Sequence, residues 1–254
     1  MQPGIAPITE ITQLMTVEKP ITRKQRLLAV VRLIRPQFII AYIIIGISAL
    51  AFGLFQDYKL LSFGSAFFAF VPIILAAIGV HLRDEAGDWS AGYDLESGGM
   101  GVIREGIFAE QAVRNWGRVI TLIAIFLGIY QAIEQPLMLL VGIPMFVVII
   151  YANYLTEEVP LGHELVTASS YWGTFLWVYL YQEWPLTLSI ILGSFFIYLI
   201  VLALIPYQDI ADYEVDYKSG KKTLTVRLGL DGVGHLSIFL ALFSLLILCL
   251  ALLV

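Results

Sequence analysis

The sequence has 254 residues, of which 59% are apolar and only 14% carry a charge, and its mean hydropathy is +0.85. A water-soluble domain carries about 25% charged residues, and one core cannot hide so large an apolar excess. The composition therefore excludes a soluble domain and indicates an integral membrane protein in contact with the lipid bilayer. The net charge of −5 and the scattered basic residues disfavour a nucleic-acid partner, and the single cysteine excludes a disulfide within one chain.

The chain begins with a mixed, polar segment, residues 1–36, which lacks the pattern of a cleaved signal peptide. Seven apolar runs follow, and each approaches the roughly 20 residues that a membrane-spanning helix needs. They cover residues 38–55, 61–82, 118–133, 137–154, 165–182, 185–207 and 232–254. The sequence thus predicts an all-α, polytopic membrane helix bundle of about seven transmembrane helices. Residues 1–36 are expected to form a cytoplasmic N-terminal segment and 37–254 a single transmembrane domain.

The distribution of basic residues predicts the orientation in the membrane. If the N-terminus is cytoplasmic, the cytoplasmic segments are 1–36, 83–118, 155–164 and 208–231, and these hold every Lys and Arg except Lys59. Basic residues concentrate in cytoplasmic loops of membrane proteins. We therefore expect the N-terminus on the cytoplasmic side and the end of the last helix on the opposite side.

Two of the expected cytoplasmic segments are also rich in acids. In 83–118, Asp84 and Asp88 are four residues apart and would share one face of a helix. Alone, such a pair is more typical of charges at a helix end than of a binding site. A second acidic cluster lies in 208–231, on the same predicted side of the bundle. Two clusters that face each other are harder to explain as solvated charges.

The second cluster contains Asp209, Asp212 and Asp216, whose spacings of three and four residues place them on one face of a continuous helix, with Glu214 on the opposite side. Clustered carboxylates repel each other unless a cation lies among them. Oxygen ligands suit Mg²⁺ or Ca²⁺, and Mg²⁺ commonly uses one or two carboxylates together with substrate phosphates. Basic residues directly after the cluster, among them Lys221, would suit a metal-bound diphosphate. A solvated juxtamembrane helix is the alternative interpretation.

These motifs resemble those of the UbiA superfamily of intramembrane prenyltransferases, in which aspartate-rich motifs follow the second and sixth helices. The similarity is most specific over residues 209–229, where the DxxDxxxD motif is followed by a tail similar to the superfamily's Gly-Lys-x-Thr-Leu-x-Val-x-Leu-Gly. Weaker similarities occur at residues 35–36, 98–106, 151–154 and 162–166. The resemblance thus extends over about residues 30–229.

The resemblance implies Mg²⁺-dependent transfer of an isoprenyl group from an isoprenyl diphosphate to an aromatic or other hydrophobic lipid-pathway acceptor. The positions that match catalytic metal ligands are Asp84, Asp88, Asp209, Asp212 and Asp216. The positions that match diphosphate contacts are Arg104 and Lys221. Ring faces of aromatic side chains can stabilise a carbocation, and Tyr171 and Trp172 are candidates for this role. His163 and Glu164, near the expected cavity mouth, are candidates for a general base.

The sequence departs from the superfamily pattern at several points. Val80 stands where Asn usually begins the first motif, Gly92 stands where a third Asp would fall, and residues 155–158 lack the usual Lys. The superfamily typically has nine helices, so the last two are expected to be absent from this sequence. A UbiA-type membrane terpene synthase, which uses the same metal clamp without an acceptor, and a shortened non-catalytic member remain alternatives. A transporter is disfavoured, because transporters usually place charges at the bilayer midplane.

Overall fold

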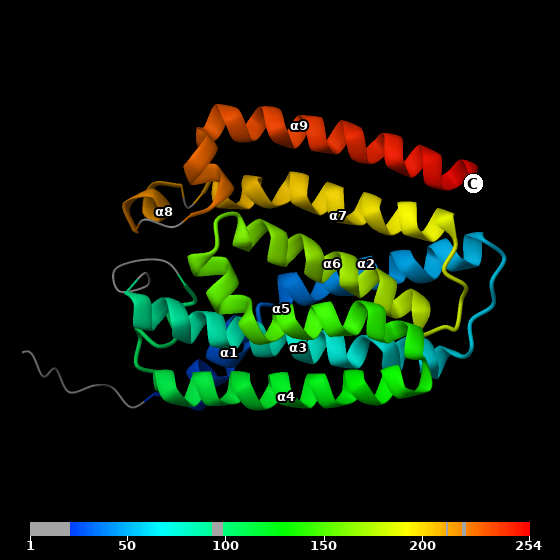
Figure 1. Cartoon of the computed structure of the whole chain (residues 1–254). Helices are drawn as coiled ribbons and strands as arrows, with labels where there is room; N and C mark the ends of the chain where they lie inside the picture. Colours follow the sequence, from blue (N-terminus) through cyan, green and yellow to red (C-terminus); the bar gives the residue numbers. More distant parts are fainter. Residues whose placement is uncertain (1–20, 93–98, 212, 220–221) are drawn as a thin grey trace, which may run out of the picture.

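The computed structural model describes residues 21–92, 99–211, 213–219 and 222–254, and every regular element within these ranges is a helix (Figure 1). The helices are α1 (Arg23–Ile34), α2 (Pro36–Phe55), α3 (Phe63–Ala91), α4 (Glu110–Glu134), the short 3₁₀ helix η2 (Pro136–Met138), α5 (Leu139–Glu158), α6 (Gly162–Leu180), α7 (Leu188–Asp209), α8 (Tyr213–Ser219) and α9 (Leu224–Leu253). The predicted all-α bundle is confirmed.

Seven of these helices are long, and each coincides with most of one predicted apolar run. Within the described part of the chain, six of them are long and apolar enough to cross a membrane. The seventh, α6, is less apolar, and it packs against α2, α5 and α7. Because twelve of its residues are buried by its neighbours, its polar groups need not face lipid.

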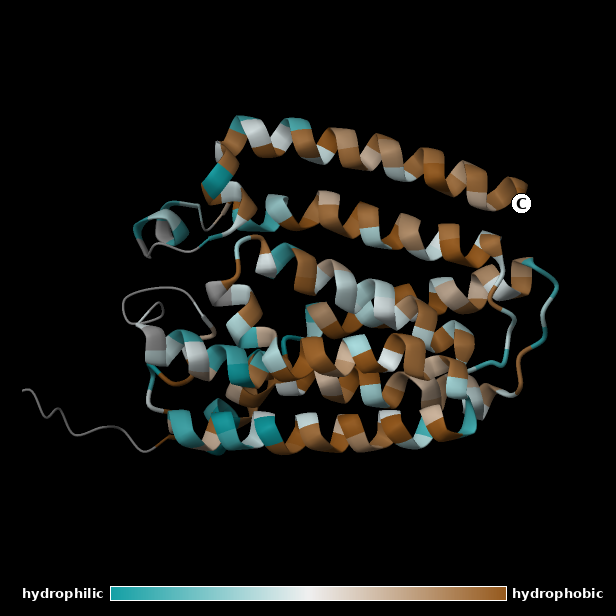
Figure 2. Cartoon of the chain, in the orientation of Figure 1, coloured by the Kyte–Doolittle hydropathy of each residue, from teal (hydrophilic) through white to brown (hydrophobic). Residues whose placement is uncertain are grey.

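The long helices run roughly side by side, and polar residues gather at one end of the bundle (Figure 2). This end carries α1, α8 and the connections from α3 to α4 and from α5 to α6 (Figure 1). The middle of the bundle is mostly apolar (Figure 2). The last turns of α3 and α7, from which the two acidic segments continue, therefore lie at the same end of the molecule.

The polar connections are shorter than the sequence predicted. Segment 83–118 contains the last turns of α3, which continues to Ala91, and the first turns of α4, which begins at Glu110. Segment 208–231 likewise contains α8 and the start of α9. The turns of α3 and α4 stay helical because their apolar side chains pack into one cluster at this end of the bundle. The buried members of the cluster are Ala29, Leu33, Leu82, Ala86, Val102, Ile103 and Val113.

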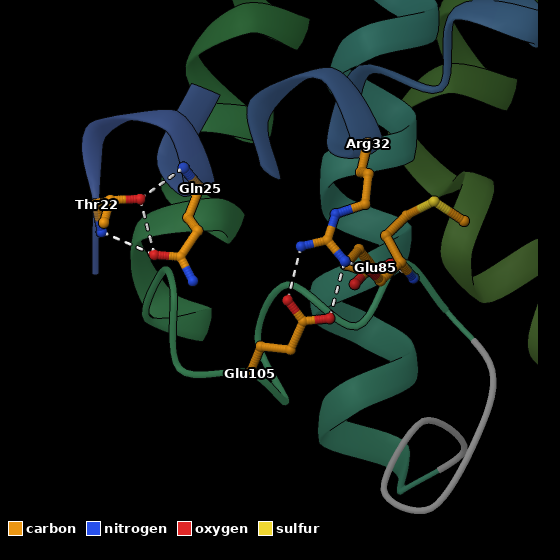
Figure 3. Close-up of polar contacts among 6 residues, drawn as sticks. Thr22, Gln25, Arg32, Glu85 and Glu105 are labelled. Carbon is orange, nitrogen blue, oxygen red and sulfur yellow. Dashed lines mark hydrogen bonds and ion pairs between the residues drawn. The ribbon is translucent and has the colours of Figure 1, made fainter. Parts of the chain in front are cut away.

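The N-terminal segment contains a helix of its own, α1, which the sequence did not predict. It begins with a capping box, in which the Thr22 hydroxyl accepts from the Gln25 amide at 3.2 Å and the Gln25 side chain accepts from the Thr22 amide at 2.9 Å (Figure 3). It ends at Arg35, whose φ of 52° is left-handed, and Pro36 then begins α2. Leu33 is buried in the end cluster, so α1 is packed onto the bundle.

Candidate functional site

A cavity of about 200 Å³ lies among α2 to α7. Its lining includes charged, imidazole and amide side chains from five helices or their caps: Arg35, His81, Asp84, Asn153, His163 and Gln208. The rest of the lining is mostly apolar and aromatic, and it includes Phe38, Ile73, Ala77, Met145, Phe146 and Trp177. A ligand with a polar head and an apolar body would match this distribution.

The antiparallel order of the helices brings the polar lining residues together. Arg35 directly precedes α2, His163 lies in the first turn of α6, and Gln208 lies in the last turn of α7. Asp84 lies about two turns before the end of α3, and Asn153 lies in the second half of α5. All five therefore lie toward the polar end of the bundle, and we call the part of the cavity that they line the cavity mouth.

Arg35 joins the start of α2 to the first acidic motif. Its guanidinium lies 3.3 Å from a carboxylate oxygen of Asp84 and 3.5 Å from one of Glu85. The side chains of Arg35 and Glu85 are only 13% and 3% exposed, so water screens their attraction weakly. Breaking a buried ion pair typically costs about 3–5 kcal/mol, because one charge is left uncompensated. The pair with Glu85 therefore fixes the Arg35 guanidinium at the cavity mouth, where it meets Asp84, whose side chain is 30% exposed.

A second set of polar contacts holds residues 99–108 against α1 and α3 (Figure 3). Glu85 accepts a hydrogen bond from the Met100 amide at 2.9 Å, and Arg32 donates to the Met100 carbonyl at 3.1 Å. Arg32 also forms a two-pronged ion pair with Glu105, at 2.8 and 2.7 Å. The hydrogen bond from Arg32 lowers the pKa of Glu105 below its ordinary value. Glu85 thus stabilises the connection after α3, beside the acid that lines the cavity.

Three predicted site residues remain: Asp88 of the first motif, and Arg104 and Lys221, which were expected to contact the diphosphate. Asp88 is half-buried and lies one helical turn after Asp84 on α3. Arg104 is exposed and is not among the residues that line the cavity. Lys221 lies outside the described residues.

The second acidic motif is divided between two helices. Because α7 ends at Asp209 and α8 begins at Tyr213, the prediction of one continuous helix through Asp216 is wrong. Pro206, in the last turn of α7, lacks the amide hydrogen of a helical bond, and its carbonyl accepts a hydrogen bond from the Thr225 hydroxyl at 3.1 Å. The Pro206 carbonyl, which a continuing helix would offer to the amide of residue 210, is thus engaged by α9 at the point where α7 ends.

Burial nevertheless separates the acids of the second motif as the sequence predicted. Asp209 and Asp216 are 9% and 6% exposed, whereas Glu214 is exposed. His163 Nε2 lies 3.6 Å from Asp209 Oδ1, so this acid adjoins the cavity mouth. Asp212 lies outside the described residues.

The donor set at the mouth fits an anionic ligand. Arg35 Nε, His81 Nε2 and Asn153 Nδ2 are buried atoms of cavity-lining residues that have no hydrogen-bond partner within the described parts of the chain. Arginine and amide N–H groups donate to phosphate oxygens, and arginine does so with its full charge. The carboxylates of Asp84 and Asp209 approach the mouth from α3 and α7. In residues 21–92, 99–211, 213–219 and 222–254, no three His, Cys, Asp or Glu side chains are arranged to hold a metal ion.

One of the two aromatic candidates faces the cavity. Tyr171 lines it and stacks on Tyr42 with ring centroids 4.6 Å apart. Tyr42 lines the cavity as well, and its hydroxyl is 2.8 Å from that of Ser170, which fixes this ring of the pair. Trp172 instead donates a hydrogen bond to Ser194 on α7 at 3.2 Å and does not line the cavity.

Sequence reasoning missed Asn153 and Gln208 as mouth residues and did not identify Arg35 as the partner of Asp84. The available signal was weak: Asn153 is a single polar residue near the end of a long apolar run, and Arg35 and Gln208 lie at the borders of such runs. Glu164, considered above as a general base, has a structural contact instead. It is 1% exposed and accepts a hydrogen bond from the first amide of α9. A carboxylate is favourable at a helix N-terminus because the helix dipole is positive there.

Comparison with protein-family models and with curated proteins gives no match. Among solved structures, the chain is similar to a UbiA homolog from Archaeoglobus fulgidus bound to GPP and Mg²⁺, with a TM-score of 0.65 and 13% identity over 89% of this chain and 85% of that one. A second structure of a UbiA homolog from the same organism, bound to DMAPP and Mg²⁺, gives a TM-score of 0.62 and 13% identity over 88% and 84%. The chain is therefore an integral, multi-pass membrane protein with the fold of these UbiA homologs.

Proposed function

We propose that this protein is a Mg²⁺-dependent intramembrane prenyltransferase, which transfers an isoprenyl group from an isoprenyl diphosphate to an aromatic or other hydrophobic acceptor. The observation that carries the proposal is one cavity with a charged mouth between the two acidic motifs and an apolar interior. The UbiA homologs with this fold are bound to GPP or DMAPP and Mg²⁺, which supports the same substrate class here.

The residues proposed as metal ligands come from both motifs: Asp84 and Asp88 from α3, Asp209 from the end of α7, and Asp212 and Asp216 from the segment that follows it. Their donor chemistry fits, because Mg²⁺ prefers oxygen ligands and often shares carboxylates with substrate phosphates. When bound, Mg²⁺ would offset charge on the diphosphate and make it a better leaving group. Asp84 and Asp209 are proposed to take part from opposite sides of the mouth.

Other side chains are proposed to hold the diphosphate and the apolar chain. Arg35 and Asn153 carry buried N–H groups suited to diphosphate oxygens, and Arg35 is positioned by Asp84. Arg104 and Lys221 are further candidates on the resemblance alone. The apolar interior would exclude water from the allylic cation, and the stacked ring of Tyr171 would offer it a negative face. With the mouth on the cytoplasmic side, as the basic residues indicate, the diphosphate would enter from the cytoplasm.

The proposal is tested with purified protein in nanodiscs, labelled geranyl diphosphate and a panel of aromatic and lipid acceptors. We expect Mg²⁺-dependent diphosphate release together with a prenylated acceptor. Diphosphate release with a cyclic hydrocarbon or alcohol as the product would instead identify a terpene synthase. Binding without any release, with an intact mouth, would identify a non-catalytic member and overturn the proposal.

A further inference from the structure

The inner end of the cavity has a defined position in the bundle. Along α6 the lining runs from His163 at the mouth to Trp177, a stretch of roughly 20 Å at 1.5 Å per residue. Along α3 it runs from Asp84 back to Pro72, roughly 18 Å by the same rule. Gly128 is the lining residue of α4 farthest from the polar end. The inner end of the cavity, which we call the cavity floor, therefore lies at Pro72, Gly128 and Trp177.

Trp177 is fixed at the floor by buried hydrogen bonds. Trp177 is 5% exposed, and its indole N–H donates a hydrogen bond to Gln131 Oε1 at 2.8 Å. Gln131 is fully buried, and its Nε2 in turn donates to the carbonyl of Phe68 at 2.8 Å. The indole cannot rotate without leaving a buried amide oxygen unsatisfied, which is costly in an apolar interior.

Packing also restricts the Trp177 ring. It meets Phe146 edge to face, with ring centroids 6.3 Å apart. A methyl group built at Gly142 would lie 3.0 Å from the indole, and one built at Gly128 would lie 3.5 Å from it and 3.1 Å from Phe146. Glycines on α4 and α5 therefore let both helices close against the ring, and the floor has little room to deepen.

We propose that Trp177 is the specificity-determining residue that limits the length of the isoprenyl chain, and that Gln131 is a positioning residue that holds it. The inference rests on the function proposed above. A volume of about 200 Å³ is below the roughly 300–1,000 Å³ of pockets for drug-sized ligands, so the cavity suits a short chain of about geranyl size. A longer chain that continued inward past the floor would have to displace the indole and break its bond to Gln131.

The test compares two non-ionisable probes, the S-thiolodiphosphates of geranyl and geranylgeranyl alcohol, with Mg²⁺ present and the full chain in nanodiscs. The wild-type protein should bind the geranyl analogue more tightly. Trp177→Leu should shift the ratio of the two dissociation constants toward the longer chain by about tenfold or more, because a hydrophobic pocket discriminates by that factor per added group. Trp172→Leu is the matched control on the same helix, since Trp172 does not line the cavity, and it should leave the ratio unchanged.

Two more variants keep the inference testable if Trp177→Leu does not fold. Gln131→Met keeps a similar volume but removes the hydrogen bond, so it should give a smaller shift in the same direction. Ala124→Leu fills the cavity one turn from Gly128 and should shift the ratio toward the shorter chain. Both dissociation constants in a ratio are measured on the same variant, so a loss of folded protein affects both measurements equally and leaves the ratio unchanged.

The possible failures are distinguishable. If the wild-type protein binds the geranyl analogue but the ratio is the same in all variants, the floor does not set chain length and the inference is wrong, while the proposed function stands. If the wild-type protein binds neither analogue, the proposed function fails and the inference fails with it.

Discussion

Asp216 and Glu214 provide a matched pair, because both lie on α8, two residues apart, and differ mainly in burial. Asp216 is 6% exposed and is a proposed metal ligand, whereas Glu214 is exposed. Removing one group that stabilises developing charge costs about 2.7–4 kcal/mol, or roughly a hundredfold to a thousandfold in rate. A substitution of an exposed charge usually changes free energies by at most about 0.5 kcal/mol, or roughly a factor of two. Asp216→Asn should therefore nearly abolish turnover, and Glu214→Gln should stay close to wild type.

The assay is Mg²⁺-dependent release of diphosphate from geranyl diphosphate, normalised to the amount of folded protein measured by size-exclusion chromatography. Because Asp216 is buried, its substitution can also change stability, so the thermal midpoint of each variant is measured in parallel. Asp209→Asn, at the end of α7, should be as damaging as Asp216→Asn. If Glu214→Gln lost as much activity as Asp216→Asn at equal stability, the assignment of buried acids to the site would be refuted.

Three further predictions concern the metal, the pH dependence and the orientation. Binding of geranyl diphosphate, followed by equilibrium dialysis, should vanish in EDTA and return with Mg²⁺; equal binding in EDTA would contradict the metal clamp. Because Arg32 lowers the pKa of Glu105, their ion pair stabilises the protein above the ordinary carboxyl pKa, and this contribution is lost as the pH falls through the lowered value. Both side chains are more than a third exposed, so Glu105→Gln should destabilise by at most about 0.5 kcal/mol at neutral pH, and the difference in thermal midpoint should narrow below about pH 4. In a Cys249→Ser background, Ser97→Cys should react with a membrane-impermeant maleimide only after cells are permeabilised. Labelling of intact cells would show that the predicted orientation is wrong.

The sequence predicted the bundle well because the length and hydropathy of the apolar runs decide whether a helix can span a membrane. It predicted the helix ends less well. α3 continues to Ala91 and α4 begins at Glu110 because Ala86, Val102 and Val113 pack together, and such contacts between distant segments leave no local signal. The sequence did not predict α1 for the same reason. Its residues belong to a mixed, polar N-terminal segment, and only their contacts with α3 show that they form a packed helix.

The site was predicted in part, and the missing part depends on tertiary contacts. The acids were recognisable by their spacing and number. The break after Asp209 was not predicted, and the contact found there, between the Pro206 carbonyl and the Thr225 hydroxyl of α9, forms only in the fold. The role of Arg35 was hidden similarly, since its contact with Asp84 joins residues that are 49 positions apart.

Four acids at the polar end of the bundle, Glu85, Glu164, Asp84 and Asp209, divide into two pairs by what they contact. Glu85 and Glu164 each accept a hydrogen bond from a backbone amide, of Met100 and of Leu224, and each thereby fixes a segment at the polar end of the bundle. Neither is among the residues that line the cavity. Asp84 lines the cavity, and Asp209 adjoins a histidine that does. A carboxylate that accepts from a backbone amide holds a chain segment in place, whereas a carboxylate at a cavity mouth can also reach a divalent cation and its diphosphate ligand.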